Sequence, residues 1–115
     1  MSKRSVMLLL EDMLESMDKI ERYTRGLSFQ QFLSDDKSVD AVVRNLEIIG
    51  EAANRLPHDF RAAHPEIEWI QIAGLRHRIV HEYFGVDLNL VWQILSFDLP
   101  NLKSKLLPCR DQTST

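Results

Sequence analysis

Residues 74–84 read Gly-Leu-Arg-His-Arg-Ile-Val-His-Glu-Tyr-Phe, and the rest of the chain is organised around this stretch. It places two arginines, two histidines and a tyrosine within the eight positions from Arg76 to Tyr83. A helical projection of about 100° per residue puts Arg76 in the middle of an apolar face. That face consists of Trp69, Ile72, Ala73, Ile79, Val80 and Tyr83. Because an unpaired guanidinium is costly to bury, Arg76 has either a carboxylate partner or an opening to solvent and ligand.

The two histidines of this stretch admit several interpretations. His77 and His81 lie one helical turn apart on the flank of the apolar face. They suit polar surface or capping residues, half of a zinc site, or acid–base chemistry near neutral pH. A zinc site needs further ligands, and His58, His64 and Cys109 lie apart in the sequence. We therefore predict no metal and no other cofactor.

Two glutamates upstream are candidate partners for Arg76. Glu47 and Glu51 lie one turn apart on the flank of a predicted helix, and either could form an ion pair with the guanidinium. Both also fit a solvated helix edge, which is the interpretation that we favour for Glu51. Glu47 therefore stays the candidate partner of Arg76.

Composition limits the classes of protein that the chain can belong to. Its 115 residues are 44% hydrophobic and 27% charged, which indicates one globular domain. The single cysteine, Cys109, allows no internal disulfide framework, and we predict a cytoplasmic protein. No apolar run approaches the roughly 20 residues of a membrane span, so no membrane partner is predicted. Near the N-terminus, Glu11 and Asp12 cut short the apolar run that a signal peptide would need. The net charge of −3 opposes general nucleic-acid binding, so any action on RNA must rest on a local basic site.

Apolar residues recur at intervals of three and four along most of the chain, which predicts amphipathic helices. The first runs from about residue 6 to residue 23 and ends near Gly26. Ser28 to Gln31 form a capping box that opens a short helix, and residues 34–38 are a polar break.

The next predicted helix begins at Val39 and ends before Leu56-Pro57. Gly50 lies in its apolar face, and since glycine weakens a helix, this place indicates close approach of another helix. Ile48 and Ala52 lie on the opposite face and suggest a second contact surface, such as a subunit interface.

The C-terminal half is predicted to be helical as well. A short helix at residues 59–64 precedes a central helix from Trp69 to Tyr83, and Asp87 caps a last amphipathic segment that ends near Leu106. Pro100 interrupts that segment, so we expect a kink or a restart there. No strand pattern is present, and the predicted fold class is all-α. Residues 1–107 form the predicted domain, and residues 108–115 a flexible polar tail that frays.

The spacing Arg76-x4-His81-x-Tyr83 resembles the Arg-x4-His-x-Tyr motif of the HepT toxins, which belong to the HEPN superfamily. The resemblance covers nearly the whole chain, from about Val6 to Leu107. Other phrases similar to HepT text occur in family order, namely Ile20–Thr24, Arg44–Ala52, His64–Ile67, Ile72–Arg76, Tyr83–Asp87, Val91–Trp92 and Asp98–Pro100. One departure is Glu82, which stands where many relatives have glycine.

The resemblance implies an antiparallel, up-and-down helical bundle of the HEPN type that forms a homodimer, with the motifs of two protomers facing one cleft. It implies a metal-independent endoribonuclease that acts as the toxin of a type VII toxin–antitoxin pair. The implied partner is a minimal nucleotidyltransferase of the MntA type, which silences the toxin by adenylylating the motif tyrosine, here Tyr83.

Metal-free RNA cleavage needs a base, an acid and a cation at the phosphorus. His81 suits the acid–base steps, and Arg76 suits the phosphorane because its planar fork can grip two oxygens. Within one ideal helix these two side chains point about 140° apart, so they can share a phosphate only if the helix ends near His81 or if a second protomer contributes. His77 and Tyr83 are candidate auxiliary or phosphate-positioning residues.

Two functions therefore remain open. The first is the ribonuclease toxin with Arg76 and His81 as catalytic residues. The alternative is a catalytically silent helical module that only forms a complex with its nucleotidyltransferase partner. A binding module has no need of His81, so substitution of this residue distinguishes the two.

Overall fold

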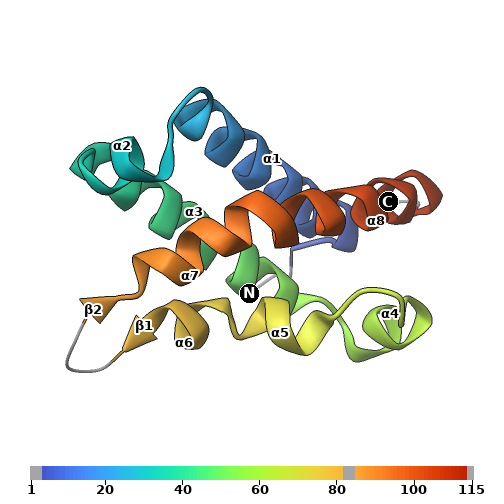
Figure 1. Ribbon diagram of the computed structural model, residues 1–115. Coiled ribbons are helices and arrows are strands. Elements are labelled where there is room, and N and C mark those ends of the chain that lie inside the picture. The colour runs from blue at the N-terminus through green and yellow to red at the C-terminus, as the bar shows by residue number, and fades with distance from the viewer. Residues whose placement is uncertain (1–3, 82–84, 114–115) are drawn as a thin grey trace.

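The computed structural model describes residues 4–81 and 85–113, and these are mostly helical, which confirms the all-α class. Figure 1 shows helices α1 (Val6–Thr24) and α3 (Asp36–Arg55) running in opposite directions, with the C-terminal helices crossing them. A row of short elements, from α5 to β2, lies beside the C-terminal helices. No helix in the described ranges is long and apolar enough to cross a membrane.

Side-chain caps open the N-terminal helices, and the sequence predicted the one at Ser28. The Ser5 hydroxyl accepts the Leu8 amide at 3.2 Å to open α1, and Gly26 follows its end with φ +80°. Helix α2 (Phe29–Leu33) begins with the predicted capping box, in which Ser28 and Gln31 exchange bonds of 3.1 and 2.8 Å between side chain and backbone. Both long helices bury the apolar faces that their sequence periodicity indicates.

Gly50 is a point of close helix approach, as predicted. A Cβ atom on Gly50 would lie 3.0 Å from the Ile72 carbonyl oxygen and 3.6 Å from the Leu75 Cβ. Helix α3 therefore packs by its backbone against the junction of α5 (Trp69–Ala73) and α6 (Leu75–Ile79).

The prediction of one continuous central helix from Trp69 to Tyr83 is wrong. It breaks at Gly74 into α5 and α6, and it ends at Ile79 because Val80 is extended, with φ −104° and ψ 120°. Val80 and His81 form strand β1, which pairs antiparallel with β2 (Gly85–Val86), a two-residue ladder that the sequence did not indicate. The Asp87 amide also donates to the Ile79 carbonyl at 2.7 Å, so pairing with a later segment replaces the next helical turn.

The C-terminal segment is one run of helix with a wide turn in the middle. Helix α7 (Leu88–Gln93) is capped by Asp87, whose carboxylate accepts the Leu90 amide at 3.1 Å. A π-helical turn, η1 (Ile94–Asp98), leads into α8 (Leu99–Gln112) just before Pro100. Proline has no amide hydrogen, and its ring collides with the carbonyl one turn earlier. The interruption expected at Pro100 therefore appears as a wider, π-helical turn.

Helix α8 continues beyond the predicted domain boundary at residue 107, so the tail prediction is wrong for residues 108–112. Pro108 lies inside α8, and Cys109 is buried with 2% of its surface exposed. Burial of Cys109 holds the helix past the proline, a tertiary effect that the sequence pattern does not contain. Lys103 ties α8 to α1 through Asp18 and Glu21 at 3.2 and 3.1 Å, and the bonds to Glu21 and then Asp18 raise the pKa of this lysine.

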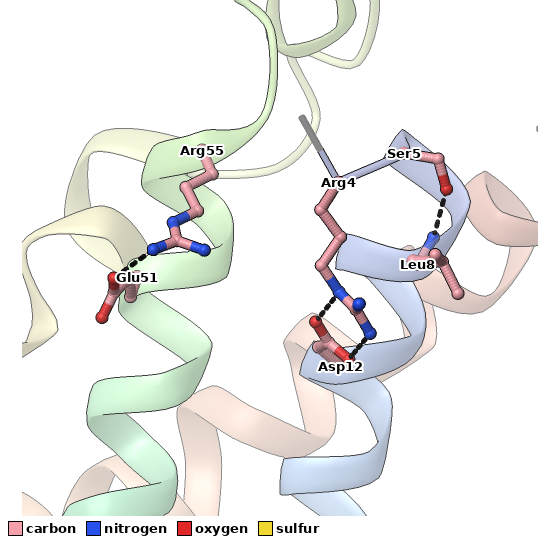
Figure 2. Close-up of polar contacts among 6 residues, drawn as sticks. All are labelled: Arg4, Ser5, Leu8, Asp12, Glu51 and Arg55. Carbon is pink, nitrogen blue, oxygen red and sulfur yellow. Dashed lines mark hydrogen bonds and ion pairs between the residues drawn. The ribbon is translucent and has the colours of Figure 1, made fainter. Parts of the chain in front are cut away.

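The face that carries Ile48 and Ala52 is partly covered. Ala52 is buried and Ile48 is half-buried, and together with Leu9 they line a shallow hollow between α1 and α3. Figure 2 shows the polar groups of this region: Arg4 forms two bonds to Asp12, at 2.6 and 2.8 Å, and Arg55 bonds to Glu51 at 2.9 Å. Each pair closes along its own segment and neither spans the hollow, so a subunit interface here stays a prediction.

Candidate active site

Arg76 and His77 are consecutive exposed residues of helix α6. The break at Gly74 turns α6 so that Leu75 and Ile79 are buried, and Arg76 faces outward rather than lying in the apolar face. Among the described residues the Arg76 side chain has no hydrogen bond or ion pair, and the expected pairing with Glu47, itself exposed on α3, is not formed. The sequence left open whether Arg76 has a carboxylate partner or faces solvent, and in the structure it faces solvent.

The end of α6 at Ile79 changes the relation between Arg76 and His81. The helical projection that places the two side chains about 140° apart applies only while the backbone stays helical. The backbone of His81 is extended and belongs to β1. The separation of about 140° in an ideal helix therefore does not apply to this pair, and a phosphate shared by Arg76 and His81 of one chain stays a prediction.

The backbone around His81 is fixed from two sides. In the β1–β2 ladder Val80 pairs with Val86 and His81 pairs with Gly85, which has φ +76°. The bond from the Asp87 amide to the Ile79 carbonyl adds a tie from the start of α7. His81 thus lies where α6, the strand pair and α7 meet. Glu82 and Tyr83, the predicted modification site, lie outside the described residues.

Arg78 connects α6 to the C-terminal helices, a contact that sequence reasoning missed. Its guanidinium lies 3.4 Å from an Asp98 oxygen in η1, and the side chain is half-buried. The two residues lie on the wall of a pocket that also includes Ile72, Leu75 and Phe97. No sequence spacing links residues 78 and 98, so only the tertiary structure reveals this pair.

The fold and the motif together define a small helical protein with an exposed arginine and histidine on one short helix and a second histidine in the strand that follows it. A family model described as "Ribonuclease HepT-like" matches residues 13–108. "Probable ribonuclease HepT" of Thermococcus cleftensis is 47% identical over 90% of this chain and 94% of its own length. "Putative RNase MJ1216" of Methanocaldococcus jannaschii is 38% identical over 91% of this chain and 87% of its own length.

The chain belongs to the HepT-like ribonuclease family. No solved structure gives a significant match to it. The resemblance seen in the sequence is thereby confirmed at the level of the family.

Proposed function

We propose that this protein is a metal-independent endoribonuclease, the toxin of a type VII toxin–antitoxin pair. The observation that supports this proposal most is the exposed Arg76, which has no partner among the described residues and lies on a helix that ends two residues before His81. Membership of a family whose relatives are named as ribonucleases supports the same activity.

The proposed reaction uses the RNA's own 2′-hydroxyl as the nucleophile. A base removes the hydroxyl proton, the oxygen attacks the adjacent phosphorus, and the 5′-oxygen leaves with a proton from an acid, which gives a cyclic phosphate and a free 5′-hydroxyl. His81 moves these protons, and Arg76 stabilises the negative charge of the phosphorane. His77, exposed next to Arg76, assists in holding the phosphate.

A homodimer would supply both proton-transfer groups from one motif. A base and an acid are needed on opposite sides of the phosphorus, and each chain has one motif histidine. A two-fold axis that brings the α6–β1 ends of two chains to one cleft places two histidines and two arginines there. Dimerisation is therefore part of the proposed mechanism.

Regulation would act through Tyr83. In the proposed step the tyrosine oxygen attacks the α-phosphorus of ATP on an MntA-type nucleotidyltransferase, and pyrophosphate leaves. The added nucleotide is bulky and anionic, so it blocks RNA by volume and by charge. The variant Tyr83→Phe keeps the ring, and we expect it to resist modification and to stay active in the presence of the partner and ATP. Intact mass decides this, since undiminished AMP transfer to Tyr83→Phe contradicts the assignment.

The decisive experiment is cleavage of total RNA by purified protein in the presence of EDTA. We expect the wild type to cleave and His81→Ala to lose about 10²–10⁴-fold in rate, the usual loss for a positioned acid–base group. His58→Ala, an exposed histidine at the start of α4 (His58–Ala63), is the matched control and should cleave like the wild type. Equal cleavage by His81→Ala would contradict the catalytic role of His81, and no cleavage by the wild type would favour the silent binding module.

A further inference from the structure

His64, Glu66 and Cys109 come together at the end of the molecule opposite the motif. Figure 1 shows α4 and the C-terminal end of α8 at one end, and the β1–β2 pair at the other. One potential ligand atom from each residue, a ring nitrogen, a carboxylate oxygen and the thiol sulfur, lies within 4.8 Å of the other two. His64 and Cys109 lie far apart in the sequence, and only the fold brings them together.

The loop between α4 and α5 holds the histidine in place. The His64 ring lies against the Phe60 ring, with centroids 4.6 Å apart. Its carbonyl accepts the Trp69 indole N–H at 3.0 Å and the Ile67 amide at 3.2 Å, and its own amide donates to Arg61 at 3.1 Å. This tight turn presents His64 and Glu66 on the same side, with 3.4 Å between Nδ1 and Oε2. His64 is therefore held in place before any ligand arrives, with Glu66 beside it.

Cys109 faces this turn from helix α8. It is buried, His64 is half-buried and Glu66 is exposed, so the cluster has a closed side and a side open to solvent. Burial, and secondly the Glu66 carboxylate, raise the pKa of the Cys109 thiol to about 11. A buried cysteine alone is an ordinary core residue, but here the sulfur lies beside a nitrogen and an oxygen ligand.

We propose that His64, Glu66 and Cys109 form a binding site for one divalent cation with the coordination chemistry of Zn²⁺. Nitrogen, sulfur and carboxylate oxygen are its usual ligands, and bond lengths of about 2.0–2.3 Å put tetrahedral ligand atoms roughly 3.3–3.8 Å apart. The exposed Glu66 side chain can rotate to close the remaining gap, and water takes the fourth position on the open side.

The site clamps the α4–α5 loop to the C-terminal end of α8. Binding replaces the thiol proton, which is released to solvent, and the charges of thiolate and carboxylate balance the charge of the cation. Because the cluster and the strand pair lie at opposite ends of the molecule, this cation has no part in the proposed RNA chemistry.

Cobalt titration of metal-free protein tests the proposal directly. Tetrahedral Co²⁺ gives intense visible bands, and a Co²⁺–thiolate bond gives a charge-transfer band in the near ultraviolet. We expect both bands to saturate at one Co²⁺ per chain and to disappear when Zn²⁺ displaces the cobalt. Cys109→Ser should lose the charge-transfer band, and His64→Gln should weaken Zn²⁺ binding at least about tenfold. His58→Gln is the matched control and should bind like the wild type.

A second measurement separates a lost ligand from a lost fold. Circular dichroism should show native helix content in each variant without metal. Zn²⁺ should raise the melting temperature of the wild type and of His58→Gln by more than that of Cys109→Ser or His64→Gln. Absence of the tetrahedral spectrum in the wild type, or the same affinity in wild type, Cys109→Ser and His64→Gln, would overturn the proposal.

Discussion

Helices α1 and α3 are unbroken over 19 and 20 residues, whereas the chain from α5 to β2 is divided into two helices of five residues and two strands of two. The long helices bury one face each along their whole length and supply much of the core. The divided segment changes backbone direction twice, and each change exposes side chains that a continuous helix would have turned into the core. The divided segment also contributes Leu75 and Ile79 to the core, but its candidate residues Arg76 and His77 lie outside the core.

The largest expected effect is a loss of activity, with stability unchanged, when Arg76 in the divided segment is substituted. Arg76→Ala should lower RNA cleavage by about 10²–10⁴-fold, since preorganised charge at the phosphorane is lost. Arg76→Lys should recover little, because it keeps the charge and loses the fork. Cleavage rates together with thermal melts check this. Arg55→Ala, an exposed arginine on α3, is the control, and normal cleavage by both Arg76 variants would contradict the site.

Substitution of a buried residue in the long helices should have the opposite effect, a loss of stability with activity retained. Leu46 is fully buried on α3, so Leu46→Ala should lower the free energy of unfolding by about 2–5 kcal/mol through lost burial and a cavity. At a temperature where the variant stays folded, its cleavage rate should match the wild type. Urea unfolding and cleavage assays on the same sample measure both quantities. A large loss of cleavage in fully folded Leu46→Ala would show that the two regions are coupled.

Gly50 joins the two regions, so its substitution should affect both. In Gly50→Ala the new methyl group meets the Ile72 carbonyl at 3.0 Å, and neither backbone can move without shifting the α5–α6 junction. We expect a loss of about 1 kcal/mol in stability, since crowding exceeds the gain in helix propensity. Displacement of α6 should slow cleavage about tenfold. Asn54→Ala, an exposed position on α3, is the control. If Gly50→Ala is more stable than the wild type and fully active, the α5–α6 junction can shift to accommodate the methyl group without cost.

The smallest expected effect concerns the Arg78–Asp98 ion pair. Its side chains are 32% and 50% exposed, so the pair should contribute less than about 1 kcal/mol to the free energy of unfolding. A double-mutant cycle with Arg78→Ala and Asp98→Ala measures this coupling energy. A value well above that limit would mean that this ion pair is a main stabilising contact between α6 and η1.

The sequence by itself determined the helical class, the caps at Ser28 and Asp87, the close approach at Gly50 and membership of the family. These are local properties: periodicity places apolar faces, side-chain oxygens satisfy the first amides of a helix, and a glycine within an apolar face indicates close packing. The sequence also picked out Arg76 and His81 as the candidate catalytic pair, an assignment that stays a prediction until the variants are measured.

Only the tertiary structure decided where α6 ends, which way Arg76 points and how far α8 continues. The helical periodicity of the sequence continues through Val80. In the structure, however, the Asp87 amide donates to the Ile79 carbonyl and Val80 pairs with strand β2, and these bonds replace the next helical turn. In the same way, burial of Cys109 extends α8 past Pro108 and brings the thiol to His64. Such contacts join residues far apart in the chain, and a local sequence pattern cannot indicate them.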